Sequence, residues 1–436
     1  MTYNDLILVS IDDHVIEPPD AFSNHMPAHL KSRVPFVEDV NGVDYWNIDG
    51  RRYMLAGLNA VAGRPRDEYG IEPASYSELR PGSYEIKARI DDMNANGVLG
   101  SMCFPSIMGF GGGVAIDYAS IDPAYSLALV RAYNDWHVHE WAGSAPGRII
   151  PLGLLPMWDI DAAVAEAKRL SAMGVHAVSI PDNPSYNGKL PSIHSPHWDP
   201  LWKVCAEKRI VLCLHIGTGV TPPFTSAEMP VDAWMTTIPM ATASPAADWL
   251  FSSVWSRFPD LRIALSEAGI GWIPYLLERA DFIYDHHHAW TNSNFGKELP
   301  SDVFRRHFLA CFIDDKYGLK NRHEIGVDRI LWECDYPHSD CTWPDSPEIL
   351  WEGLKDIPRE EIDMMTHLNA IREFNFDPLS LLGRENCTVQ ALRQKAAHIN
   401  TAPTAGLGGA KPGGNAQVTV GDMQKQMEKQ LQGAEA

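Results

Sequence analysis

Residues 6–14 read LILVSIDDH, an apolar run that ends in two aspartates and a histidine. A short, continuous apolar run is typical of a strand that is buried on both faces of a parallel sheet. Asp12 and His14 are two positions apart, and side chains at positions i and i+2 of an extended strand face the same side. The stretch therefore predicts a buried strand whose end presents a carboxylate and an imidazole to one site.

Seven further apolar runs follow along the chain: VLGSMCF (98–104), RIIPLGLLP (148–156), HAVSIP (176–181), RIVLCLH (209–215), LRIALSEA (261–268), FLACFID (308–314) and DRILWECD (328–335). Amphipathic helices are predicted at 85–96, 123–142, 159–173, 199–208, 244–257, 271–288, 316–323, 346–354 and 359–373. Eight strand–helix units in sequence predict an α/β fold, a closed (β/α)8 TIM barrel. An open doubly wound sheet is the alternative, but it usually carries a glycine-rich phosphate loop where this first strand ends in Asp-Asp-His.

Two segments do not fit the strand–helix alternation. Residues 15–84 contain many Pro and Gly and two hairpin-like pieces, VDYWNID and RRYMLAG. Because this segment leaves the first strand at its polar end, it predicts a cap-like insertion over the mouth of the barrel. Residues 386–436 combine the tract TAPTAGLGGAKPGGNAQ with the polar helix-former GDMQKQMEKQLQ, which predicts a disordered tail or an interaction appendage. The barrel domain is then expected to span residues 1–385.

The charge balance limits the partners of the protein. The chain has 56 Asp and Glu against 36 Lys and Arg, and its net charge of −20 repels nucleic acid and anionic membranes. A small anionic substrate remains compatible, since a metal ion and one arginine can invert the potential inside a cleft. No stretch approaches the roughly 18 to 20 apolar residues of a membrane span, and the N-terminus lacks a signal-like segment, so a cytoplasmic protein acting on a small molecule is expected.

Four of the predicted strands end in a residue that can bind a metal ion or move a proton. The first strand ends in Asp12 and His14, the fifth in His215, the sixth in Glu267 and the eighth in Asp335. Functional residues of a (β/α)8 barrel lie at the C-terminal ends of its strands, so these side chains are expected on one rim. Any one alone would be read as a helix cap or a loop-stabilising residue. Together, two imidazoles and several carboxylates predict a site for Zn²⁺ or Mn²⁺.

Three further features lie near this predicted rim. His338 follows Asp335 in a Pro-bearing turn, where it would hydrogen-bond the substrate or a bound water, or stabilise the loop. Arg89 opens the run RIDDM and would bind a substrate carboxylate, or lie exposed on its helix. Residues 108–113, MGFGGG, predict a substrate-adjacent loop rather than a phosphate cradle, because no Lys-Ser/Thr follows them.

Over roughly residues 5–380 the chain resembles the amidohydrolase-related superfamily, in the branch of aminocarboxymuconate semialdehyde decarboxylase and the aromatic-acid decarboxylases. The residues that carry the resemblance are Asp12-Asp13-His14 followed by EPPD, His215 in LCLHIG and Asp335 in CDYPH. The branch has His-x-His or Glu-x-His at the first of these places. The resemblance implies a homodimer and one divalent ion, Zn²⁺ first and Mn²⁺ second, held by Asp12, His14, His215 and Asp335.

The chain departs from this family at two places. Related binuclear hydrolases carry a carbamylated lysine at the end of strand four, and HAVSIP has none, so one ion is expected. The branch often has a histidine at the end of strand six, where SEAG places Glu267. A buried carboxyl can move a proton, and the alternative is that Glu267 orients His215 or a bound water.

Two reactions fit such a site. The prediction is a non-oxidative decarboxylation of an aromatic or unsaturated carboxylic acid, in which Asp335 or Glu267 delivers a proton to the carbon that loses CO₂. The alternative is a hydrolysis of an amide, ester or C–C bond, in which the ion activates a bound water. A barrel that binds a ligand without catalysis is a third reading, but it would not require Glu267 and Asp335 beside the metal ligands.

Overall fold

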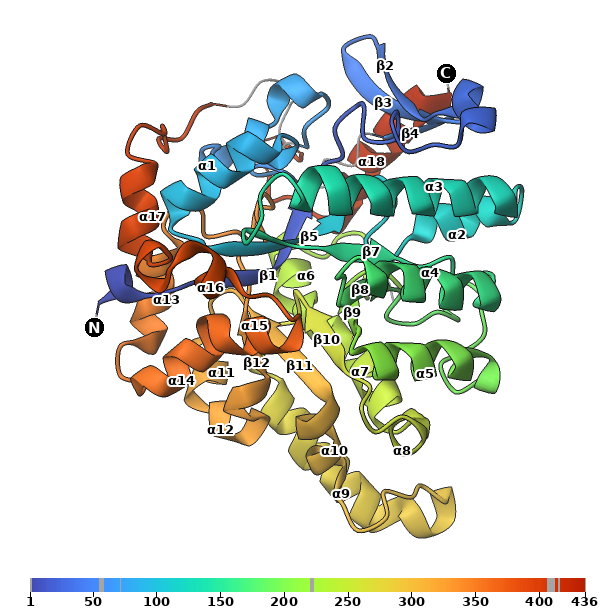
Figure 1. Ribbon diagram of the computed structural model, residues 1–436, viewed down its shortest axis with the longest axis vertical. Coiled ribbons are helices and arrows are strands. Elements are labelled where there is room, and N and C mark those ends of the chain that lie inside the picture. The colour runs from blue at the N-terminus through green and yellow to red at the C-terminus, as the bar shows by residue number, and fades with distance from the viewer. Residues whose placement is uncertain are drawn as a thin grey trace.

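Within the part of the chain that the structure describes, the strands form two parallel sheets and one antiparallel sheet (Figure 1). The computed structural model describes residues 2–54, 59–70, 72–219, 223–405, 412–414 and 416–435. The first parallel sheet has the order β1 (Val9–Val15), β5 (Gly100–Pro105) and β6 (Ile149–Ile150). The second has the order β12 (Ile330–Trp332), β11 (Phe308–Phe312), β10 (Ile263–Ser266), β9 (Val211–His215), β8 (Ala177–Ile180) and β7 (Leu152–Leu154). The predicted α/β fold with parallel strands is therefore confirmed.

Each predicted apolar run contains a strand, and the run 148–156 contains two. Pro151 lies between β6 and β7 and has no backbone N–H to donate to a neighbouring strand. The chain leaves the first parallel sheet with β6 and enters the second with β7 at this residue. At the far ends of the two sheets, the backbone N–H of Asp335 donates to the carbonyl of Asp12 at 2.8 Å, and that of His14 donates to the carbonyl of Tyr336 at 2.8 Å. The end of the last strand therefore lies against the end of the first.

The strands are buried on both faces, which explains their uninterrupted apolar sequences. In β9, Val211 and Cys213 belong to one buried cluster, whereas Leu212 and Leu214 belong to the other. Successive side chains of a strand point to opposite faces, so a strand with apolar neighbours on both sides shows no polar alternation. Only the last residue of β9, His215, is polar, and it marks where the strand reaches the site.

Helices lie between the strands where the sequence predicts them. They are α1 (Ile86–Asn96), α3 (Pro123–Trp136), α4 (Ile160–Ala172), α5 (Asp199–Lys208), α7 (Ala243–Leu250), α9 (Ile273–Thr291) and α13 (Ser346–Leu354). Their ends follow local chemistry: Asp159 caps α4 by accepting from Ala162 N, and Gly97, at φ +77°, ends α1 as predicted.

Several predicted helices are shorter or interrupted. The segment 123–142 ends in a π-helix, His137–Ala142, and 244–257 divides into α7 and α8 (Val254–Arg257). Residues 316–323 divide into α11 (Lys316–Lys320) and α12 (Arg322–Ile325). The segment 359–373 contains α14 (Arg359–Asp363), a π-helix (Met364–Leu368) and α15 (Asn369–Glu373). Helices outside the predicted segments include α2 (Gly113–Ala119), α6 (Val231–Thr237), α10 (Pro300–His307) and α16 (Pro378–Leu382).

The segment after β1 forms the antiparallel sheet of β2 (Phe36–Val40), β3 (Val43–Ile48) and β4 (Arg51–Met54). Residues 55–57 of the predicted RRYMLAG piece lie outside the described residues. Further along, Asn59 Nδ2 donates to Ser339 Oγ at 2.6 Å, and the backbone N–H of Ala62 donates to the carbonyl of Pro337 at 2.9 Å. These bonds hold part of the 15–84 segment against the loop that follows β12.

The C-terminal residues form two helices, α17 (Val389–Lys395) and α18 (Val420–Glu435). Val389 and Leu392 are buried, and the N–H of Val389 donates to the carbonyl of Leu6 at 2.9 Å. Residues 406–411, 415 and 436 of the predicted tail lie outside the described residues, and the domain boundary near 386 stays a prediction. Within the described residues, no helix is both long and apolar enough to cross a membrane.

Trp249 of α7 tests how much the packing of helices around the sheets contributes to stability. It is fully buried, its ring centroid lies 5.6 Å from that of Trp202 and 5.9 Å from that of Trp255, and its N–H donates to the carbonyl of Asp182. We expect Trp249→Ala to lower the free energy of unfolding by about 3–5 kcal/mol in urea titrations, because it leaves a large cavity. Tyr275→Ala, at a side chain that is 74% exposed, should change it by less than about 0.5 kcal/mol. A similar loss for both variants would contradict this prediction.

Candidate metal centre

The end of β1 presents Asp12 and His14 to one side and Asp13 to the other. Asp12 Oδ1 lies 3.6 Å from His14 Nε2, whereas Asp13 accepts hydrogen bonds from Tyr336 N and from the Ser101 hydroxyl. The pairing of β1 with β5 shifts register between Ser10 and Asp13, so the ladder is irregular beside the site. Such irregularities re-aim side chains near functional sites, and this one lies where Asp12 turns toward the imidazoles.

His215, the last residue of β9, faces the first strand. Its Nε2 lies 3.2 Å from His14 Nε2 and 3.6 Å from Asp12 Oδ2. Its Nδ1 lies 2.8 Å from the carbonyl of Ile216, an arrangement in which Nδ1 carries the proton and donates. The lone pair of Nε2 is then directed at the cluster, which is how a histidine prepared for metal binding is held.

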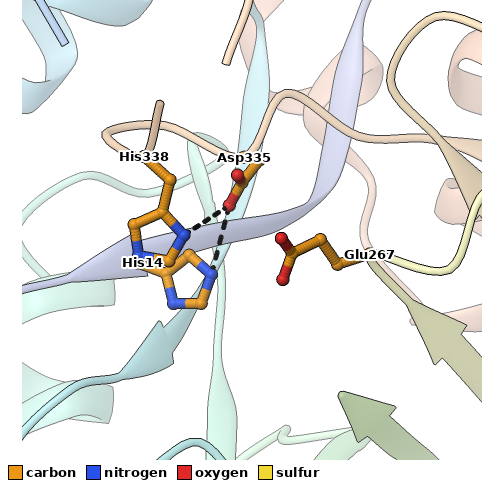
Figure 2. Close-up of side chains that lie close together, drawn as sticks. All are labelled: His14, Glu267, Asp335 and His338. Carbon is orange, nitrogen blue, oxygen red and sulfur yellow. Dashed lines mark ion pairs between the residues drawn. The ribbon is translucent and has the colours of Figure 1, made fainter. Parts of the chain in front are cut away.

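Asp335 follows β12 and joins the cluster from the last strand (Figure 2). Its Oδ1 lies 3.2 Å from His14 Nε2 and 2.9 Å from His338 Nδ1. The His338 ring stacks on that of His14 with centroids 3.7 Å apart. Asp335 has φ +60°, a left-handed conformation that is uncommon for a residue with a side chain, and its N–H bond to Asp12 holds it there.

Glu267 follows β10 and reaches the cluster from the opposite side to His338 (Figure 2). Its Oε2 lies 3.4 Å from His215 Nε2, and its side chain is 20% exposed, unlike the fully buried ligand candidates. It too is left-handed, at φ +55°, and its N–H donates to Glu333 Oε2 at 3.1 Å. Glu333 thereby fixes the backbone that aims Glu267.

The buried carboxylates fit a divalent cation. Asp12 and Asp335 are fully buried, and none of their carboxylate oxygens accepts a hydrogen bond from the described residues. Unpaired buried carboxylates are costly, so such oxygens call for a cation or for protons. Ligand atoms of Asp12, His14 and His215 lie within 4.8 Å of one another, as do those of His14, Glu267, Asp335 and His338. The residues that the sequence predicted as ligands are therefore all brought together.

Burial sets the protonation of this cluster. It lowers the pKa of His215 to about 3 and that of His14 well below its ordinary value, so both imidazoles are neutral, the form that binds metal ions. Burial raises the pKa of Asp12, Asp335 and Glu267, and in Asp12 the charges of Glu333 and Asp335 raise it further. Crowded carboxylates of this kind hold protons when no cation compensates them.

A cavity of about 490 Å³ opens beside the cluster. Its polar floor contains Glu267, Glu333 and Asp335, and one wall carries Met235, Ile238 and Met240. On the other side of the histidines, the Phe110 ring lies 4.5 Å from His14 and 4.2 Å from His215, centroid to centroid. The predicted loop 108–113 thus covers the imidazoles with an aromatic ring, and a substrate entering the cavity would meet the carboxylates first.

Both predictions for Arg89 are wrong. Its side chain does not line the cavity, where it would bind a substrate carboxylate, and it is not exposed on α1. Arg89 is 1% exposed, its guanidinium donates to the carbonyls of Gly82 and His14, and it lies over the Tyr336 ring. Through its bond to the His14 carbonyl, Arg89 contacts the carboxyl end of β1, and its charge also lowers the pKa of Asp13 against the effect of burial. Arg89 therefore supports the strand that carries Asp12 and His14.

Two buried glutamates near the site escaped the sequence analysis. Glu333 stands two positions before Asp335, so the alternation rule applied to Asp12 and His14 would have indicated it. Glu17, in EPPD, accepts hydrogen bonds from the N–H groups of Ser106 and Ile107 at 3.1 and 2.9 Å and so holds the segment that leads to Phe110. Burial raises its pKa to about 7. No local pattern distinguishes Glu17 from a solvent-exposed glutamate.

The family model described as Amidohydrolase matches residues 49–376. The chain is 25% identical over 262 residues to the 2-amino-3-carboxymuconate-6-semialdehyde decarboxylase of Dictyostelium discoideum, covering 59% of this chain and 69% of that protein. It is 24% identical over 341 residues to the gamma-resorcylate decarboxylase of Rhizobium sp. (strain MTP-10005), covering 73% and 96%.

Solved structures share the fold at lower identity. An amidohydrolase from Mycobacterium avium subsp. paratuberculosis K-10 superposes with a TM-score of 0.65 at 20% identity, covering 84% of this chain and 97% of that one. The 5-carboxyvanillate decarboxylase of Novosphingobium aromaticivorans DSM 12444, with bound manganese and 3-methoxy-4-hydroxy-5-nitrobenzoic acid, has a TM-score of 0.61 at 14% identity, covering 85% and 97%. At such identities the likeness is one of fold.

Removal of His215 tests whether the cluster binds a cation. We expect wild-type protein dialysed against Zn²⁺ or Mn²⁺ and then metal-free buffer to retain about one ion per chain, and His215→Ala to lose at least about 10-fold in affinity. Bound metal is measured by mass spectrometry, and the rise in Tm on adding metal should disappear with it. The matched control is His286→Ala, at an exposed histidine of α9. Full metal retention by His215→Ala would refute the site.

Glu17 gives a dependence of stability on pH. Its pKa in the folded protein is about 7 against an ordinary 4.5, so its contribution is fully present below pH 4.5 and is lost as the pH rises to about 7. The side chain of Glu17→Gln stays neutral at every pH. The variant's free energy of unfolding, relative to that of wild type, should therefore rise by up to about 3 kcal/mol between pH 5 and pH 8 in urea titrations. Glu278→Gln, at an exposed position of α9, should show no such gain. A constant difference for Glu17→Gln across this range would contradict the prediction.

Proposed function

Because the chain belongs to the amidohydrolase family, whose members are metal-dependent enzymes, we propose that it is a non-oxidative decarboxylase of an aromatic or unsaturated carboxylic acid. The observation that carries the proposal is the position of Glu267: a carboxyl group that borders both the histidine–carboxylate cluster and the cavity. Two relatives, over most of their length, are named as decarboxylases of acids of this kind. Because the relatives are only 24% to 25% identical to this chain, the proposal covers the class of reaction and does not name the individual acid that is the substrate.

The proposal includes the architecture that such a site requires. The two parallel sheets form one closed (β/α)8 barrel, supported by the hydrogen bonds between the end of β12 and β1, with residues 1–385 as its domain and 386–436 as an appendage. The 15–84 segment acts as a cap-like insertion, supported by Asn59, which lines the cavity. A homodimer and a cytoplasmic location remain predictions.

Asp12, His14, His215 and Asp335 are the proposed ligands of a single divalent ion. One ion is expected because β8, the fourth strand of the barrel, is followed by Pro181 and carries no lysine. We expect Zn²⁺, with Mn²⁺ as the alternative, and a protein of the same fold binds manganese. The ion, when bound, supplies positive charge that attracts a substrate carboxylate and a neighbouring oxygen into the acidic site.

Glu267 is the proposed proton donor. It is the partly exposed carboxyl at the cavity, whereas Asp335, the second candidate for this step, is fully buried between His14 and His338. The Glu267 proton goes to the substrate carbon that carries the carboxylate, forming a C–H bond. The electrons of the C–CO₂⁻ bond then return to the ring or alkene, and CO₂ leaves. Water in the cavity reprotonates Glu267, so protons and electrons balance without a redox partner.

His338 and Glu333 have supporting roles in this scheme. His338 pairs with Asp335 and stacks on His14, so it holds both ligands in place. Its Nε2 is buried and has no hydrogen-bond partner among the described residues, and a contact from it to the substrate stays a prediction. Glu333 holds the backbone of Glu267. Hydrolysis is the second candidate, favoured by the description of the family itself, and it would use the same cavity and carboxylates.

A panel of hydroxylated benzoic acids and unsaturated carboxylic acids, incubated with metal-loaded enzyme, tests the reaction. A cavity of about 490 Å³ admits an acid with a single ring. We expect equal amounts of CO₂ and of the product in which hydrogen replaces the carboxylate. Glu267→Gln should lower kcat by about 100-fold or more with metal still bound, because only the proton donor is lost. Glu278→Gln, at an exposed position of α9, is the matched control. Hydrolysis products without CO₂ would replace the decarboxylase by the hydrolase, and unchanged turnover in Glu267→Gln would refute the role of that residue.

A further inference from the structure

The C-terminal segment pairs with a loop that leads into the cavity wall. Thr419 forms an antiparallel bridge with Pro230. Around it, the N–H of Val231 donates to the carbonyl of Val418 at 3.0 Å, that of Val420 to Met229 at 2.9 Å and that of Gly421 to Ala227 at 2.8 Å. Val420 is only 3% exposed, so its side chain is enclosed at this junction. Residues 418–421 are therefore paired to the 227–231 loop over several residues rather than at a single contact.

The loop continues directly into the apolar wall of the cavity. This wall, residues 231–240, contains α6 and the cavity-lining residues Met235, Ile238 and Met240. Helix α6 has seven residues, and none of them is buried. A helix this short is marginal in isolation and gains its stability from packing, which here is slight. The position of the wall thus depends on what holds its two ends: residues 418–421 before it, and α7 after it.

The same C-terminal region also contacts the segment on the other side of the cavity mouth. Helix α18 packs against β4 of the antiparallel sheet, as its place behind β4 indicates (Figure 1). Upstream of it, the N–H of Thr404 donates to the carbonyl of Gly63 at 2.9 Å, and Arg80 donates to the carbonyl of Asn400 at 3.1 Å. The C-terminal region therefore connects the 15–84 segment, which contributes Asn59 to the cavity, with the wall that contributes the two methionines.

We propose that residues 418–435 are a positioning element of the substrate cavity, which holds the 231–240 wall in the place where Met235 and Met240 contact the apolar part of the substrate. Met235 and Met240 are 44% and 47% exposed, and methionine side chains adapt well to an apolar or aromatic ring. This role rests on the proposed function for its substrate. The segment contributes no group to the metal cluster, so it acts on substrate affinity and not on metal binding.

Gly421→Val tests the pairing with a small change far from the cluster. A Cβ at Gly421 would lie 3.0 Å from the Ala227 carbonyl oxygen and 3.2 Å from its Cβ, so valine displaces the segment from the loop. A second variant, Val420→Asp, places a charge at the same enclosed junction. Lys425→Ala, at a side chain of α18 that is 80% exposed, is the control. Metal content and Tm, measured first, show that each full-length variant is folded and loaded.

Two measurements decide the inference. Hydrogen exchange should become faster in residues 227–240 of Gly421→Val and Val420→Asp, but not in Lys425→Ala. With an acid that the wild-type enzyme decarboxylates, KM should rise by about 5-fold or more while kcat changes by less than about 2-fold, as expected when only substrate binding is weakened. Unchanged exchange, or faster exchange with unchanged KM, overturns the proposal. An enzyme that decarboxylates no acid of the panel refutes the proposed function alone, and hydrogen exchange then decides whether the segment holds the wall.

Discussion

The backbone hydrogen bond from Asp335 N–H to the carbonyl of Asp12 is the contact on which the site depends. It joins the end of the last parallel strand to the end of the first, and it holds Asp335 in the left-handed conformation that directs its carboxylate toward His14. The companion bond from His14 N–H to the carbonyl of Tyr336 fixes the same junction from the other strand. Without this junction, residues from opposite ends of the chain would have no common site.

Around that junction the protein gathers charges that water would otherwise stabilise. The carboxylate oxygens of Asp12 and Asp335 are buried and accept no hydrogen bond from the described residues, and Glu333 and Glu267 lie beside them. The nearby imidazoles are neutral because burial lowers their pKa. Burying several carboxylates together is unfavourable because they lose water and repel one another. A divalent cation offsets this repulsion more fully than protons do. The net charge of the whole chain is −20, which repels an anionic substrate. A bound cation would offset this repulsion at the site and so allow such a substrate to approach.

The parts of the site that face the substrate come from segments outside the parallel strands. Phe110 covers the histidines from the loop before α2, Asn59 reaches the cavity from the 15–84 segment, and Met235 and Met240 lie on a wall paired with the C-terminal segment. The strands and their end residues could be predicted because burial on both faces leaves a local signature in the sequence. The sequence also predicted a substrate-adjacent loop at 108–113 and a cap-like insertion at 15–84, but not which of their residues reach the site, nor that residues 231–240 form a wall. These segments are short, polar or Gly/Pro-rich, and the positions of their side chains depend on partners far along the chain.

The sequence by itself determined the parallel α/β fold and the polar residues that stand at or just after the ends of four strands, because strand periodicity and apolar runs are local properties of the chain. It also indicated that Asp12 and His14 share a side, since that follows from the geometry of a single strand. Only the tertiary structure decided that the Glu267 side chain is partly exposed in the cavity while that of Asp335 is fully buried at its floor. It also decided that Glu333 holds Glu267, and that Arg89 binds the His14 carbonyl of β1 rather than lining the cavity. These facts depend on how separate segments pack against one another. The burial of a side chain, or its distance from a residue far along the chain, cannot be deduced from the local sequence pattern around either residue.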